Sequence, residues 1–182
     1  GQYGSAHTAT LAHWTAGEGV DLAASGRVDV TVNGVRLDPH ATVAIDDDKI
    51  IFNDTTGILS LTEAGSYMVT IKLKANYEWA DSTKDDVVYY GKIYKQYITG
   101  LALSADTTYT GEAQTQQVTA RIGSTADTWS KDALQIVSVT GTSLAAVGAL
   151  PAEKISQENG TFEVTYAGAY DVVIGLSDPY NY

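Results

Sequence analysis

The stretch Gly57-Ile-Leu-Ser-Leu-Thr-Glu-Ala-Gly-Ser-Tyr67 recurs without a gap as Gly160-Thr-Phe-Glu-Val-Thr-Tyr-Ala-Gly-Ala-Tyr170, at an offset of 103 residues (170 − 67). Beyond it every second residue stays apolar in both copies, so that Tyr67, Val69, Ile71 and Leu73 match Tyr170, Val172, Ile174 and Leu176. A period near 100 residues is longer than the roughly 20–50 residues of solenoid repeats. The repeat therefore indicates two tandem domains.

Weaker matches extend the repeat toward the N-terminus. Residues 31–37 (TVNGVRL) match residues 138–144 (SVTGTSL), and residues 4–8 match residues 111–115, both at an offset of 107 (138 − 31). The change from 107 to 103 predicts four extra residues in a loop of the first copy, near Asp46-Asp-Asp48. We expect two domains, residues 1–95 and 96–182, each of a common domain size.

The apolar pattern has a period of two along most of the chain, which is typical of half-buried strands. The stretches with this pattern are rich in Val, Ile, Thr and Tyr and are bounded by Gly, Asn, Asp and Pro. They cover residues 28–32, 49–52, 57–62, 66–75, 87–95, 117–122, 134–140, 160–165 and 169–177. Short strands at this spacing predict an all-β fold of two tandem immunoglobulin-like antiparallel β-sandwiches, with at most one helical turn near Ser130.

Composition excludes several classes of protein. A net charge of −11 disfavours binding to nucleic acid or to an anionic membrane surface, because both carry negative charge. No apolar run reaches the ~18 residues of a membrane helix. Since the chain has no Cys, disulfides do not stabilise it.

The two copies differ where the second one ends. The first copy continues past Asn76-Tyr77 into the strand predicted at residues 87–95, whereas the second ends at Asn181-Tyr182. We expect the second sandwich to lack its closing strand within this chain. Either the array continues in a longer protein, or another subunit supplies the strand to the open sheet edge.

Two motifs resemble those of a known family. Residues 64–73 (AGSYMVTIKL) followed by residues 76–86 (NYEWADSTKDD) resemble the segment "AGTY-x-V-x-V-x-L … NY-x-W-x-DGT" of bacterial immunoglobulin-like repeats, and residues 108–114 resemble their "YTGKAQ" entry. One departure is Ser82, where the family motif has Gly. The resemblance implies an extracellular stalk or adhesin module of a large bacterial cell-surface protein. It implies as partners a host or cell-surface glycan or protein and the neighbouring repeats of the same chain.

The motif residues have structural roles that follow from their chemistry. Ala64-Gly65 and Ala167-Gly168 predict a tight turn between strands, with Gly needed for a positive φ. We expect Tyr67 and Tyr170 to pack their rings inward and to bond a backbone group through the hydroxyl. Tyr77 and Trp79 are two residues apart, so in a strand they share one face.

Signals for a binding site are few. Asp46, Asp47 and Asp48 are weak candidates for calcium, since the spacing of an EF-hand loop is absent. Trp129, Trp79 and Trp14 are candidates for stacking on sugars, Trp129 foremost because its surroundings are polar. No nucleophile elbow or phosphate-binding loop is present in the sequence, and we expect neither an enzyme nor a cofactor.

These observations predict a structural or adhesive module that acts as a spacer or adhesion surface outside a bacterial cell. One alternative is a carbohydrate-binding module that uses exposed Trp or Tyr. A further alternative is a filament subunit that is completed by strand donation.

Overall fold

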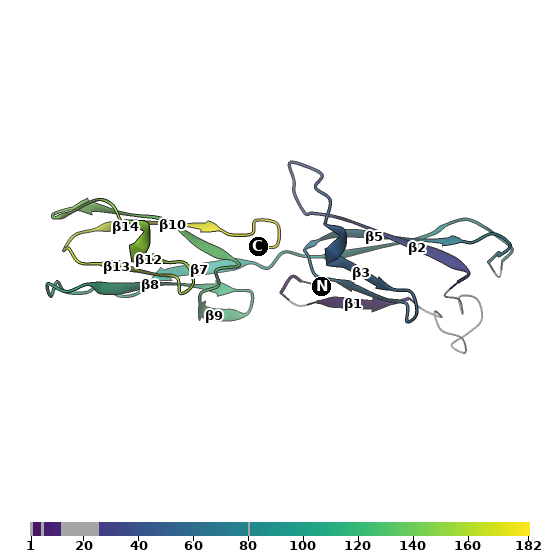
Figure 1. The fold of residues 1–182 in the computed structure, drawn as a ribbon, viewed down its shortest axis with the longest axis horizontal. Helices are drawn as coiled ribbons and strands as arrows, with labels where there is room; N and C mark the ends of the chain where they lie inside the picture. Colours follow the sequence, from purple (N-terminus) through teal and green to yellow (C-terminus); the bar gives the residue numbers. More distant parts are fainter. Residues whose placement is uncertain (1, 5, 12–25, 80) are drawn as a thin grey trace. The chain divides into compact units, whose positions relative to one another are not determined.

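The computed structural model describes residues 2–4, 6–11, 26–79 and 81–182 (Figure 1). The described residues form strands β1 to β14 and two 3-10 turns, η1 and η2, so the predicted all-β class is confirmed. They divide into unit 1, which is Gly1–Lys95 with Asn181, and unit 2, which is Gln96–Tyr180 with Tyr182. Nowhere in the part of the chain that the structure describes does a helix have the length and apolar character needed to span a bilayer.

Unit 1 is a sandwich of two antiparallel sheets. One sheet has the order β1-β4-β3 and the other β2-β5-β6. The elements are β1 (His7–Thr10), β2 (Val28–Val35), η1 (Asp47–Lys49), β3 (Ile50–Asn53), β4 (Ile58–Leu61), β5 (Gly65–Leu73) and β6 (Val87–Ile93).

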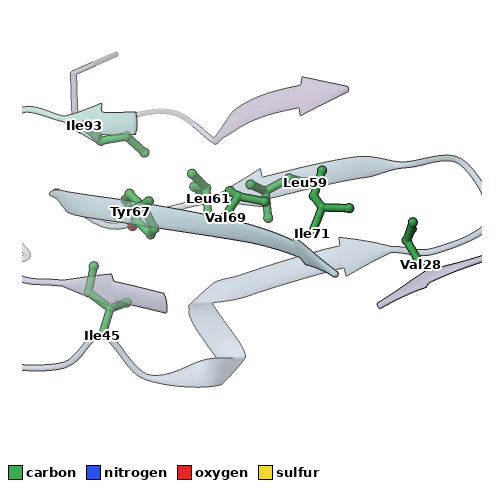
Figure 2. Close-up of a cluster of buried hydrophobic side chains, with 8 residues drawn as sticks. All are labelled: Val28, Ile45, Leu59, Leu61, Tyr67, Val69, Ile71 and Ile93. Atoms are coloured by element: carbon green, nitrogen blue, oxygen red, sulfur yellow. The ribbon is translucent and has the colours of Figure 1, made fainter. Parts of the chain in front are cut away.

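Both sheets contribute to the core of unit 1. Tyr67, Val69 and Ile71 of β5 are 2%, 8% and 1% exposed, and the residues between them are partly exposed, as the period of two predicts. They pack with Leu59 and Leu61 of β4 in the other sheet (Figure 2). Burial of this apolar face is the main favourable contribution to folding of the unit.

Unit 2 is also a sandwich of antiparallel sheets. One sheet has the order β12-β13-β8-β7, with β9 paired to β8, and the other has the order β11-β10-β14 (Figure 1). The elements are β7 (Ile98–Leu103), β8 (Gln114–Ile122), β9 (Thr125–Thr128), β10 (Leu134–Ser143), β11 (Ala146–Ala149), η2 (Ala152–Lys154), β12 (Ile155–Ser156), β13 (Thr161–Val164) and β14 (Tyr170–Leu176). Val118 and Phe162 of the first sheet pack with Ile136 and Val139 of the second.

The sequence repeat is also a repeat of strand pairing. In unit 1 Gly34 of β2 lies opposite Tyr67 of β5, and in unit 2 Gly141 of β10 lies opposite Tyr170 of β14. The pairs β1-β4 and β3-β4 likewise match β8-β13 and β12-β13. One difference is a bulge between Ile136 and Ser138 of β10. The duplicated residues therefore occupy equivalent places in two equivalent sandwiches.

The four extra residues of the first copy are divided between two places, the segment before the 3-10 turn and the start of β3 directly after it. The first residues of the two 3-10 turns, Asp47 and Ala152, are 105 positions apart in the sequence. This offset lies between the offset of 107 found before the turns and the offset of 103 found after them. Phe52 and Ile155, which pair with Leu59 and Phe162, are again 103 apart. Two of the four extra residues thus lie before the 3-10 turn of the first copy, and the other two lie after it. The sequence comparison did not predict this division.

Two expectations about the motif were wrong. Gly65 does not have a positive φ, because it belongs to the extended strand β5, whereas Gly168 in the second copy has a φ of 158°. A Cβ at Gly65 would lie 2.6 Å from the Val35 carbonyl oxygen, so close backbone approach explains the glycine. In addition, β5 ends at Leu73, and Tyr77 and Trp79 lie outside it, so strand alternation does not place them on one face.

The loop after Trp79 explains how the chain accommodates Ser82. Ser82 has a φ of 64°, in the left-handed region that Gly adopts readily, and its N–H donates to the Trp79 carbonyl at 2.8 Å. Thr83 donates its N–H and hydroxyl to the Asp81 carboxylate at 3.0 and 2.7 Å. These bonds lower the pKa of Asp81.

Replacement of Ser82 by Gly is expected to raise the free energy of unfolding by about 0.5–1 kcal/mol. The strain of a left-handed residue is relieved, while the greater freedom of Gly in the unfolded chain offsets part of the gain. Urea denaturation at neutral pH measures the difference. A matched change, Ser66→Gly within β5, should instead destabilise the protein, and a Ser82→Gly variant no more stable than the parent would contradict the left-handed assignment.

Candidate functional site

The tyrosine that follows each repeated Ala-Gly pair bonds its own backbone four residues earlier. The hydroxyl of Tyr67 donates to the Glu63 carbonyl at 2.6 Å, and the hydroxyl of Tyr170 donates to the Tyr166 carbonyl at 2.6 Å. The expected backbone partner is thereby confirmed in both copies. Such a bond fixes the corner between two strands, as the tyrosine corner of Greek-key sandwiches does.

The surroundings of Tyr67 favour its neutral form. Burial raises the pKa of Tyr67 above its usual value, the Glu63 carboxylate adds to the rise, and the Arg36 guanidinium opposes it. Arg36 and Glu63 form an ion pair at 2.6 Å, each side chain 12% exposed. Since the folded pKa is raised, this contribution to stability is complete below the ordinary tyrosine pKa and is lost as pH rises through the folded value.

The change Tyr67→Phe should lower the free energy of unfolding at pH 7 by about 0.5–1.5 kcal/mol, because one internal hydrogen bond is lost. The variant should also lose less stability than the parent between pH 9 and pH 11, since it has no phenol to ionise at this site. Urea denaturation across this pH range tests both effects. Tyr90→Phe is the control, since Tyr90 is 79% exposed, and an identical pH response of the two variants would refute the role given to Tyr67.

Trp129 is a packing residue of unit 2. Its ring is partly buried against both core clusters of the unit, and its indole N–H donates to the Gln157 carbonyl at 2.8 Å. A Cβ placed on Gly160 would lie 2.1 Å from ring atom Cδ2, so the ring packs directly on that glycine. Much of the ring face is therefore covered, and sugar stacking at Trp129 stays a prediction.

The other aromatic candidates have different surroundings. Trp79 is partly buried against the core of unit 1, and its indole N–H donates to the Asp85 carbonyl at 2.7 Å. Tyr77 is 42% exposed, and the Arg27 guanidinium lies 5.7 Å from its ring centre. Trp14 lies outside the described residues.

The three acidic candidates form one exposed turn rather than a metal cage. Asp46 precedes η1, and Asp47 and Asp48 form its first two residues. The Asp48 carboxylate lies 3.4 Å from the Lys49 ammonium. Among residues 2–4, 6–11, 26–79 and 81–182, no three His, Cys, Asp or Glu side chains are grouped as a metal site requires.

A groove of about 540 Å³ lies in unit 2, and none of the tryptophan or aspartate candidates lines it, whereas the motif residues Gly168 and Tyr170 do. Its apolar wall comes from inward-facing residues of β13 and β14, among them Phe162, Val164 and Val172. Its other wall is polar and includes Gln114 and Gln116 of β8. The groove thus opens into the sandwich interior between the two sheets.

Aromatic rings stand at the rim of the groove. Tyr109 and Tyr166 line it and are 59% and 63% exposed. Their exposed ring faces are chemically suited to a sugar or to a polypeptide, whereas the Gln114 amide donates to the Thr108 carbonyl at 2.6 Å and the Gln116 amide oxygen accepts from the Ser104 hydroxyl at 2.8 Å. Sequence reasoning did not select Tyr109 and Tyr166 as site residues, because the motif of residues 108–114 and the repeat of residues 160–170, in which they lie, were read as structural.

No protein-family model matches the chain, and no curated protein matches it at the level that indicates a relative.

Proposed function

We propose that the chain is a structural module of a bacterial cell-surface protein, built from two immunoglobulin-like repeats that space or display an adhesive surface. The observation that supports this most directly is the duplication itself. The residues that recur are Gly34 and Gly141, Tyr67 and Tyr170, and the apolar positions that follow each tyrosine. These residues serve folding, so what the chain repeats is a framework.

The spacer role follows from simple mechanics. A folded sandwich extends less under load than an unfolded chain, because its strands are joined by many backbone hydrogen bonds that must break together. Repetition of such a unit increases length in proportion to copy number. The resemblance of residues 64–86 to bacterial surface repeats agrees with this role.

Location is tested by antibody labelling of intact cells of the source organism. Antibodies raised against the purified chain should stain unpermeabilised cells, and protease added outside the cells should remove the signal. A cytoplasmic protein of the same cells is the control, and it should stain only after permeabilisation. Staining of this chain only after permeabilisation would overturn the proposal.

A further inference from the structure

We infer that the groove of unit 2 is a strand-acceptor site, and that its occupant is an antiparallel strand with the residue pattern of β6, supplied by a further repeat of the same kind. The acceptor itself does not depend on the proposed spacer role. Only the source of the strand, a further repeat, rests on the proposed function of the chain as part of a protein built from such repeats. The occupied form of the same site is present in unit 1.

In unit 1 the strand β6 covers the edge of β5. The two strands pair from Gly65 opposite Ile93 to Ile71 opposite Val87. Ile93 is 3% exposed and belongs to the same buried cluster as Leu61 and Tyr67, and Figure 2 shows it beside them. Ile93 therefore anchors the strand in the sandwich interior.

In unit 2 the equivalent edge is open. β14 matches β5, yet among the described residues it pairs only with β10 and forms the end of its sheet. A sheet edge exposes unpaired backbone donors and acceptors, which favours addition of another strand.

The groove occupies the place that Ile93 fills in unit 1. Gly65, Leu61, Tyr67 and Val69 surround or oppose Ile93, and their equivalents are Gly168, Val164, Tyr170 and Val172 at the offset of 103. All four equivalents line the groove.

Equivalent residues of the two copies also differ in burial, and those of unit 2 are the more exposed. Gly65, Tyr67, Val69 and Ile71 are buried, whereas Gly168 is exposed and Tyr170, Val172 and Ile174 are only partly buried. These residues are chemically similar and lie at equivalent positions, so the difference follows from the missing neighbouring strand. Covering this apolar surface would stabilise unit 2 by roughly 25 cal/mol for each Å² removed from water.

The register of the added strand follows from unit 1. The residue in the place of Ile93 should lie opposite Gly168, and the residue in the place of Val87 should lie opposite Ile174. The strand must carry an apolar residue at the first place, because that side chain enters the groove. The β6 of this chain is already paired over its full length in unit 1, so the donor is a separate β6-like strand.

The experiment is an NMR titration of the full ¹⁵N-labelled chain with a synthetic peptide of residues 86–95 (DVVYYGKIYK). Saturable shifts are expected at β13 and β14 amides, together with slower hydrogen exchange of those β14 amides that do not bond β10. The same peptide with Ile93→Asp should cause no shifts. Fusion of the peptide to the C-terminus through a flexible Gly-Ser linker raises its effective concentration and should give the same protection.

Three results would overturn the inference. One is an absence of both shifts and protection in the fused form. A second is concentration-dependent self-association of the peptide-free chain that slows exchange of the same β14 amides, since the occupant would then be a second copy. A third is saturable shifts at the groove on addition of oligosaccharides, lost in Tyr166→Ala, which would assign the groove to sugars. Cell-surface labelling is independent of all three, so failure of the proposed function and failure of this inference are distinguishable.

Discussion

Replacing Gly160 by Ala is expected to lower the free energy of unfolding of unit 2 by about 2–4 kcal/mol. Gly160 has a φ of 66°, which costs an L-residue roughly 1–2 kcal/mol. The added Cβ would also overlap the Trp129 ring, and overpacking of a well-packed site costs about 1–3 kcal/mol. The ring cannot move freely, because its indole N–H is bonded to the Gln157 carbonyl.

Two measurements check this prediction: urea denaturation of the chain, and hydrogen exchange of the β8 and β13 amides, which should be faster in the variant. Gly100→Ala is the matched control. Gly100 has a φ of 60°, and a Cβ there would meet no heavy atom within 4 Å, so this change isolates the cost of the backbone conformation. Equal losses for the two variants would show that the packing of Trp129 on Gly160 contributes nothing.

Replacing Ile93 by Ala is expected to destabilise unit 1 by about 2–5 kcal/mol, the usual cost of truncating a fully buried Ile. Ile93 is 3% exposed and lies at the end of β6, where it closes the core against Leu61 and Tyr67. Amides of β4 and β5 should exchange faster in the variant. This measures how much the closing strand contributes where it is present.

Val88→Ala is the control on the same strand. Val88 is 39% exposed and pairs with Thr70 on the outer face, so its truncation should change stability by no more than about 0.5 kcal/mol. If the two substitutions cost the same, β6 is held by backbone pairing alone. In that case the requirement that a strand added to unit 2 carry an apolar residue opposite Gly168 would have no support.

Strands that alternate buried and exposed residues could be predicted from the sequence, whereas β7 and β11 could not. β5 alternates buried and partly exposed residues along its first seven positions, and its period of two is visible in the sequence. β7 and β11 have one inward or partly inward residue each, followed only by exposed ones. A strand that buries neither face has no reason to alternate, so its sequence resembles that of a loop.

The site was predictable only in part. The missing match to β6 could be read by comparing the two copies, because a repeat shows what one copy lacks. The groove required the fold, since its walls come from Leu103, Gln116 and Tyr166 as well as from β14. Trp129 was selected for its polar surroundings, yet Gly160, 31 residues away, is the contact that defines its packing.

The segments before and directly after η1 and η2 differ in length between the two units. They differ by two residues before the turn and two after it, yet the hairpins that follow, β3-β4 and β12-β13, keep the same pairing. Insertions at these two places are therefore absorbed locally. A binding peptide inserted beside Pro151, between the end of β11 at Ala149 and the start of η2 at Ala152, would be carried on an intact framework, which makes this position a natural point for diversification and for engineered recognition.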